Sequence, residues 1–184
     1  MNMSNKYKKE LEKLYKDEDN SRCFDCGKIN KNNIKWNNLD KTPAHWASIN
    51  NGVYLCLDCS GEHRSFGVQV SYIKSLTLDQ WNETQFNTMR VGGNKRLRDF
   101  LLSNDMPEYL DKKEIYSSKL MSYYRRMLKV EAKGEMFMEQ MPPREHFWDP
   151  AETGSENENE SYSGGGLFIK IIHILVQVVI KDQV

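Results

Sequence analysis

Four cysteines in two identical pairs are the residues whose type and spacing point most directly to chemistry. Cys23 and Cys26 form one Cys-x-x-Cys pair, and Cys56 and Cys59 form the second. This spacing lets both thiolates of a pair approach one ion from a tight turn, and two pairs complete a tetrahedron. The alternatives are two unrelated pairs of buried thiols, or iron on the same ligands. We predict one Zn²⁺ with a structural role, because four cysteines leave no open coordination position.

Cys₄ modules occur in proteins of many different functions, so the cysteines alone do not indicate one. The residues around the second pair are more informative. The informative runs are Pro43-Ala-His-Trp-Ala-Ser-Ile-Asn-Asn-Gly52, Cys56-Leu-Asp-Cys-Ser-Gly-Glu-His-Arg-Ser-Phe-Gly-Val68, Ser71-Tyr-Ile-Lys-Ser-Leu-Thr-Leu-Asp-Gln-Trp81, Met89-Arg-Val-Gly-Gly-Asn-Lys-Arg-Leu-Arg-Asp-Phe100 and Tyr116-Ser-Ser-Lys-Leu120. Together they resemble the zinc-dependent GTPase-activating domain for Arf-family small GTPases. The nearest branch is the Golgi-type one, which regulates Arf at coatomer-coated membranes. The resemblance covers about residues 8–135.

The resemblance implies that Arg64 acts on the nucleotide of a partner. GTP hydrolysis develops negative charge on the β- and γ-phosphate oxygens, and a planar guanidinium can reach two of them at once. Supplied in trans, such an arginine raises the rate by about 10³–10⁵-fold. The Mg²⁺ and the water-orienting glutamine would belong to the GTPase. The chain lacks a G-x-x-x-x-G-K-S/T motif, and we expect an activator with no turnover of its own.

By resemblance and position, four residues are candidate contacts with an Arf-family GTPase in its GTP form: Trp46, Leu57, Leu78 and Asp79. A core position is equally plausible for Trp46 and somewhat better for the two leucines. Asp79 either orients Arg64 or favours the dipole at the first turn of a helix. From residue chemistry alone, Arg64 would be an ordinary solvated arginine. The neighbouring His63 should be hydrogen-bonded and structural, because the mechanism gives it no proton to carry.

The resemblance also places the protein in the cytoplasm, recruited peripherally to Golgi membranes, with coatomer as a candidate second partner. One departure from the family pattern is an insertion of about 13 residues, roughly Ile29–Lys41, between the first cysteine pair and Trp46. Loops tolerate added length cheaply, so the insertion should protrude without breaking the metal site. Whether it touches the GTPase stays open.

Hydrophobic periodicity indicates the elements that must position these residues. Helical spacing predicts helices over about residues 7–15, 77–91, from 97 on, and 116–130. Thr77 and Gln80 have the capping-box pattern for the second of these. Val53–Leu55 is a short strand-like run that leads into the second cysteine pair. The predicted fold is therefore α+β, a helix-rich domain around a small antiparallel sheet organised by the Cys₄ zinc site.

Composition divides the 184 residues into three parts. Residues 1–150 mix apolar, charged and aromatic types and form the predicted domain with its flanking helices. Residues 151–166 contain four Glu and three consecutive Gly, which is typical of a solvated linker. Residues 167–184 form an apolar tail, whose run Leu167–Ile180 is shorter than the roughly 20 residues that span a bilayer. A membrane-surface helix, a pairing strand and a sequence of doubtful origin stay open for it.

The main alternative function is a Cys₄ module that binds nucleic acid or acts as an adaptor without activating a GTPase. Lys plus Arg and Asp plus Glu each number 26, so the formal net charge is zero, whereas nucleic-acid binders usually carry a basic excess. Residues 90–133 do hold eleven basic against six acidic residues, which would serve acidic lipid headgroups as readily. We therefore expect no nucleic-acid partner. The N-terminus shows no apolar run of a secretory signal, which favours metal ligation over disulfides.

Overall fold

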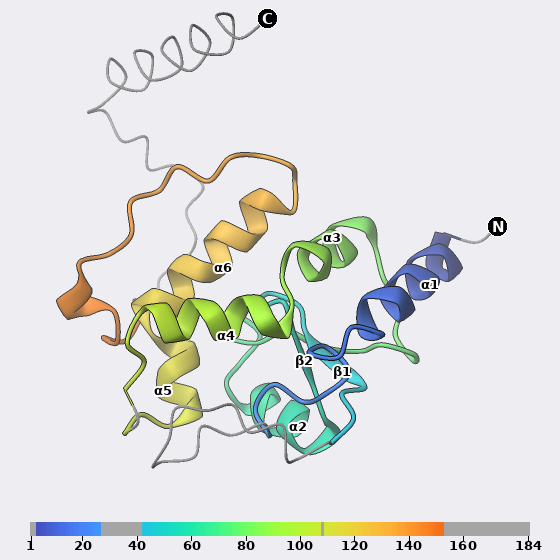
Figure 1. Cartoon of the computed structure of the whole chain (residues 1–184), viewed down its shortest axis with the longest axis horizontal. Coiled ribbons are helices and arrows are strands. Elements are labelled where there is room, and N and C mark those ends of the chain that lie inside the picture. Colours follow the sequence, from blue (N-terminus) through green and yellow to red (C-terminus); the bar gives the residue numbers. More distant parts are fainter. Residues whose placement is uncertain (1–2, 27–41, 108, 153–184) are drawn as a thin grey trace, which may run out of the picture. The chain divides into compact units, whose positions relative to one another are not determined.

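The computed structural model describes residues 3–26, 42–107 and 109–152, and Figure 1 shows how their elements follow one another. The elements are α1 (Met3–Tyr15), β1 (Trp46–Ser48), β2 (Val53–Leu55), α2 (Leu57–Ser65), β3 (Ile73–Ser75), α3 (Glu83–Val91), α4 (Asn94–Ser103), α5 (Lys112–Ser117), α6 (Lys119–Glu131) and the 3-10 helix η1 (Arg144–His146). The predicted insertion and, from residue 153 on, the predicted linker and tail lie outside the described residues.

The sheet is small and antiparallel, with the strand order β2-β1-β3. Trp46 at the start of β1 pairs with Leu55 of β2. The turn between these strands contains Gly52 at a φ of +64°, a conformation that residues with a side chain rarely adopt. The Gly93 N–H donates to the Gly52 carbonyl at 2.7 Å, and a Cβ on Gly92 would come within 2.8 Å of the Gly52 backbone. This close approach holds the hairpin against the corner between α3 and α4.

The strands separate two hydrophobic clusters, because successive side chains of a strand point to opposite faces. In β2, Val53 and Leu55 belong to the first cluster and Tyr54 belongs to the second. Helices α4, α5 and α6, with Cys59 of α2, supply the helical part of the first cluster, whereas α1 and α3 supply that of the second. Three of the four cysteines are buried members of the first cluster. The predicted metal centre thus belongs to the main core.

The structure confirms the predicted α+β class, since a three-stranded antiparallel sheet lies among helices and beside four clustered cysteines. The predicted helix over 7–15 corresponds to α1, and the predicted strand Val53–Leu55 is β2. Among the described residues, no helix has the length and apolar character needed to cross a membrane.

The predicted start of the helix after the sheet is wrong. Asn82 and Gln85 form the capping box of α3, whereas Thr77–Gln80 belongs to a turn that follows β3. The hydroxyl oxygen of Ser75 accepts two backbone N–H groups of that turn, at 3.3 and 3.1 Å. A serine that caps a turn thereby uses the donors that a helix N-terminus would have offered.

The predicted helix over 116–130 is two helices, α5 and α6, separated at Ser118. This residue has extended backbone angles, and its hydroxyl accepts the Met121 N–H at 3.2 Å, which caps α6. Ser118 also forms an isolated bridge with Pro150, so the chain beyond η1 returns to the break. Trp148, in that returning segment, packs half-buried against the first cluster.

Candidate functional site

The four cysteines predicted as ligands come together at one place, and their Sγ atoms all lie within 4.8 Å of one another. Cys56 caps the N-terminus of α2 and Cys59 lies in its first turn, while the other pair follows α1 along the chain. The Cys26 Sγ lies 3.5 Å from that of Cys56 and 3.6 Å from that of Cys59. Sulfurs about 2.3 Å from a tetrahedral zinc ion would be separated by about 3.8 Å, so the set fits such an ion.

Electrostatics also favour a cation among these thiols. A hydrogen bond from Cys59 lowers the pKa of Cys23 to about 5. Burial and then the charge of Cys23 raise the pKa of Cys26 to about 12, and the hydrogen bond to Cys23 followed by burial raises that of Cys59. One thiolate therefore suppresses the ionisation of its neighbours. A divalent metal ion would hold all four deprotonated, and in return would join the two chain segments.

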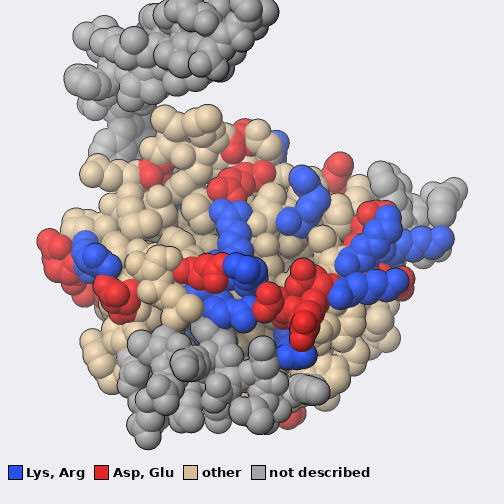
Figure 2. Space-filling view, viewed as in Figure 1, with Lys and Arg blue, Asp and Glu red and all other residues tan. Residues whose placement is uncertain are grey.

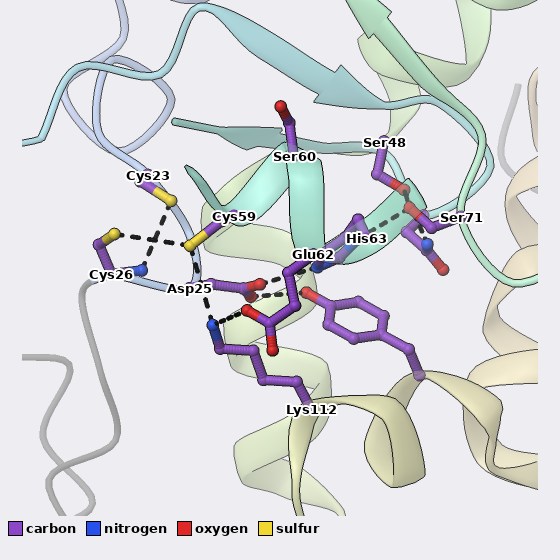
Figure 3. Close-up of polar contacts among 12 residues, drawn as sticks. Cys23, Asp25, Cys26, Ser48, Cys59, Ser60, Glu62, His63, Ser71 and Lys112 are labelled. Carbon is purple, nitrogen blue, oxygen red and sulfur yellow. Dashed lines mark hydrogen bonds and ion pairs between the residues drawn. The ribbon is translucent and has the colours of Figure 1, made fainter. Parts of the chain in front are cut away.

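Lys112, the first residue of α5, reaches this cluster from outside the cysteine pairs. Its Nζ lies 3.8 Å from the Cys59 Sγ and 2.5 Å from a carboxylate oxygen of Glu62 on α2, as Figure 3 shows. Burial opposes the charged form of Lys112, but the hydrogen bond to Glu62 and the charge of Asp25 raise its pKa above the usual value. The lysine therefore places a positive charge beside the cysteine sulfurs. Lys112 was not among the site residues predicted from the sequence.

Helix α2 carries the site residues on two opposite faces. Its inward face includes Cys59 and His63, both buried. Its outward face presents Leu57, Gly61 and Arg64, at the i, i+4 and i+7 positions that share one side of a helix. Leu57 directly follows Cys56, yet its side chain is 62% exposed. The short helix is thus fixed by its polar and cysteine side and offers an apolar residue and an arginine to solvent.

The predicted contact residues fall in different environments. Trp46 is half-buried on β1, and the guanidinium carbon of Arg64 lies 4.6 Å from the centre of its ring. The core alternative is wrong for Leu57 and for Leu78, which is 81% exposed. Asp79 does not lie at a helix start; its carboxylate accepts the Ser75 N–H at 2.6 Å and closes the turn after β3.

His63 is hydrogen-bonded and structural, as predicted. Its ring is fully buried, with Nε2 2.7 Å from an Asp25 carboxylate oxygen and Nδ1 2.8 Å from the Ser71 hydroxyl (Figure 3). The other carboxylate oxygen of Asp25 accepts the Tyr116 hydroxyl at 2.9 Å. A carboxylate, an imidazole and a serine in this order resemble a hydrolytic triad. Because all three are buried, no substrate could reach the serine, and the group is a structural element of the fold.

Asp25, Ser71 and Tyr116 were also missed by sequence analysis. The only local signal was an acidic residue between two cysteines of a predicted metal-binding pair, where Asp25 lies. Nothing in the spacing of Tyr116 or Ser71 indicates that they share a site with it.

Comparisons with known proteins agree with this geometry. Residues 8–133 match the ArfGap family, described as "Putative GTPase activating protein for Arf". The chain is 39% identical over 112 residues to ADP-ribosylation factor GTPase-activating protein 3 of Mus musculus, an alignment that covers 60% of this chain and 19% of the mouse protein. It is 38% identical over 98 residues to stromal membrane-associated protein 1 of Homo sapiens, covering 53% of this chain and 18% of the human protein.

A solved structure has a similar fold. The crystal structure of a "putative GTPase activating protein for ADP ribosylation factor" from Cryptosporidium parvum has a TM-score of 0.58 and 27% sequence identity, and the match covers 70% of this chain and 93% of that one. The alignment with ADP-ribosylation factor GTPase-activating protein 3 of Mus musculus, by contrast, spans only about a fifth of the length of that protein. Since the family match extends over most of the chain and includes all four cysteines and Arg64, the chain belongs to the ArfGap family.

Proposed function

We propose that this chain is a GTPase-activating protein for an Arf-family small GTPase in its GTP form, with Arg64 as the arginine finger. The observation that carries the proposal is the outward face of α2, where Arg64 is exposed to solvent and shares one helical face with Leu57. The family match supplies the class of partner. A guanidinium presented in this way can enter the nucleotide site of a docked protein, whereas a buried one cannot.

Apolar anchors for such a partner are available on both sides of Arg64 along the chain. The large exposed hydrophobic residues between positions 57 and 78 are Leu57, Val68, Tyr72 and Leu78. Exposed apolar and aromatic side chains of this kind are typical of the central part of an interface. We infer that Leu57 and Leu78 contact the GTPase, and that Trp46 acts mainly on Arg64, because it lies beneath the guanidinium.

The proposed roles of the remaining groups follow from their surroundings. One structural Zn²⁺ on Cys23, Cys26, Cys56 and Cys59 would fix the first turn of α2, and so the base of the helix that carries Arg64. The nucleotide, the Mg²⁺ and the attacking water would belong to the GTPase, so this chain would have no turnover of its own. We also propose that the protein is recruited from the cytoplasm to Golgi membranes, with coatomer as a second partner.

The charge distribution gives little support to the alternative of a nucleic-acid-binding module. On the face drawn in Figure 2, Lys and Arg side chains are interspersed with Asp and Glu side chains. Part of the basic surplus of residues 90–133 is engaged in ion pairs, including Arg96 with Glu131 at 2.6 Å and Arg98 with Asp19 at 2.5 Å. A binding surface for phosphates needs basic groups that are gathered and unpaired.

The test is single-turnover GTP hydrolysis on Arf loaded with GTP, with the wild-type chain and with Arg64→Lys. We expect an acceleration of the order of 10³-fold or more that the lysine variant loses while it still binds Arf. An acceleration that persists in Arg64→Lys would assign the chemistry to another residue. No acceleration by folded, zinc-loaded protein would leave a binding or adaptor module, and a steep salt dependence of binding to duplex DNA would then favour the nucleic-acid alternative.

A further inference from the structure

We propose that His63 is a positioning residue for Arg64, and that a buried chain of hydrogen bonds through Asp25 and Ser71 sets the place of the arginine. The inference rests on the proposed function, because it assigns a role in the action of Arg64. It concerns residues that the GTPase could not touch, since His63, Asp25 and Ser71 are at most 8% exposed. Any effect of these residues on hydrolysis must therefore pass through the fold of this chain.

Both ring nitrogens of His63 are occupied by partners from other segments. With the Nε2 proton donated to Asp25, Nδ1 accepts the hydroxyl of Ser71, which satisfies every group in the set. Asp25 lies between the cysteines of the first pair. Its carboxylate accepts a second hydrogen bond, from the Tyr116 hydroxyl of α5. One carboxylate thus joins the metal-binding segment, α2 and α5.

The chain of hydrogen bonds continues beyond Ser71 to the sheet. The Ser71 and Ser48 hydroxyls are 2.7 Å apart, and Ser48, the last residue of β1, accepts the Asn51 side-chain amide at 2.8 Å. Figure 3 shows His63 between Asp25 on one side and Ser71 with Ser48 on the other. The orientation of the imidazole is therefore set relative to both the cysteine cluster and β1, the strand that carries Trp46.

Helix α2 needs such an anchor because it has only nine residues, too few for a stable isolated helix. Its first turn is fixed by Cys56 and Cys59. Its last turn is fixed by His63, whose ring also packs against Phe66 at 4.9 Å and edge-on against Tyr116 at 4.4 Å between ring centres. The helix is thus held at both ends, by the cysteine cluster and by one buried imidazole.

Arg64 directly follows His63, so a rotation of the last turn would carry the guanidinium away from Trp46. A displacement of about 1 Å at a catalytic group can lower a rate by about 10²-fold. Fixing His63 from two directions limits that displacement before the partner arrives. The network therefore acts on the rate of the bound complex rather than on the affinity for the GTPase.

The experiment compares Ser71→Ala with a matched control, Ser60→Ala. Both serines are buried, but the Ser60 hydroxyl donates to the Leu57 carbonyl within α2, whereas the ring nitrogens of His63 bond to Ser71 and Asp25. Single-turnover hydrolysis on Arf·GTP is measured as a function of activator concentration, together with zinc content. We expect the maximal rate to fall by about tenfold in Ser71→Ala, with the half-saturating concentration unchanged, and Ser60→Ala to stay within about twofold of wild type.

A second readout does not use the GTPase. Proton NMR contacts between the Arg64 side chain and the Trp46 ring should weaken in Ser71→Ala and persist in Ser60→Ala. Unchanged contacts, or a rate loss equal to that of the control, would overturn the proposal. Weakened contacts in a chain whose wild type does not accelerate hydrolysis would support the positioning role and refute the proposed function. If Ser71→Ala fails to retain zinc, Tyr116→Phe, which removes the other donor to Asp25, is judged by the same two outcomes.

Discussion

The Arg64 guanidinium lies over the indole ring of Trp46, with its central carbon 4.6 Å from the ring centre. The arginine comes from α2 and the tryptophan from β1, so the contact joins the helix that begins at the second cysteine pair to the central strand of the sheet. A cation above an aromatic face is stabilised by the ring quadrupole. The side chain that we propose to act on the nucleotide therefore contacts Trp46 of its own chain in the absence of a partner.

Trp46→Leu should lower the maximal single-turnover rate more than it lowers the affinity for Arf·GTP. A contact of about 1–2 kcal/mol is lost, which corresponds to about a 5- to 30-fold decrease if it orders Arg64 in the active complex. Trp46→Phe keeps an aromatic face and should recover most of the rate. Equal losses in the two variants would instead indicate that the indole itself contacts the GTPase.

Zinc removal should unfold the region around α2, because the four cysteines join segments that are far apart in the chain. Chelation is expected to lower the melting temperature and the helical content, and added Zn²⁺ to restore both. The apparent affinity for zinc should rise between pH 6 and pH 8, since the raised pKa of Cys26, about 12, leaves its thiol protonated in the metal-free protein. Binding therefore releases protons, and acid favours the metal-free form. Unchanged melting after verified metal loss would contradict a structural role.

Lys112→Met should weaken zinc retention, because the ammonium group near the Cys59 Sγ offsets the negative charge of a four-thiolate centre. Changes in groups that contact metal ligands typically lower affinity by about 10- to 100-fold. The measurement is the rate and extent of zinc transfer to a chromogenic chelator. Lys113→Met is the matched control, since Lys113 is the next residue of α5 and is solvent-exposed. Identical transfer from the two variants would show that Lys112 matters only for its ion pair with Glu62.

The cysteine cluster could be predicted because its signal is local, whereas the role of Arg64 was inferred from the family resemblance of the residues around it. Two residues separate the cysteines of each pair, and Arg64 follows the second pair on one short helix. The supporting residues carry no such signal. Lys112 contacts a cysteine 53 positions away, and Tyr116 contacts Asp25 across 91 positions. Only the packing of α5 against the first cluster brings them there, and that packing depends on the whole core.

Leu57, Leu78 and Thr77 depart from the sequence-based predictions for physical reasons. Large apolar side chains are usually buried, yet Leu57 and Leu78 are exposed, which is the exception expected of a binding surface. The capping pattern at Thr77 was outcompeted by the turn that Ser75 closes. The capping-box rule fails here because the Ser75 hydroxyl, a neighbouring acceptor, already binds backbone N–H groups of this segment.

Tyr54→Phe should leave the stability unchanged or raise it by up to about 1 kcal/mol, because its buried hydroxyl has no hydrogen-bond partner within the described structure. Tyr116→Phe, at a site equally buried, should lower stability by about 1–3 kcal/mol, since its hydroxyl donates to a buried carboxylate. Denaturant unfolding of the two zinc-loaded variants measures the difference. A clear loss in Tyr54→Phe would reveal a partner, such as a buried water molecule, at that hydroxyl.

Substitutions at Gly61 can test docking of the GTPase without disturbing the fold. It lies between Leu57 and Arg64 on the outward face of α2, and a Cβ there would meet no atom within 4 Å. Gly61→Ala should therefore stabilise the helix by about 0.5–1 kcal/mol without loss of activation. Gly61→Trp should fold equally well but raise the half-saturating concentration for Arf·GTP at least about tenfold, because its ring would occupy the space of the partner. The same bulky residue at exposed Glu12 of α1 controls for added surface hydrophobicity. If Gly61→Trp activates normally, the GTPase does not dock on this face of α2, and Arg64 would have to be reached from the side of Trp46.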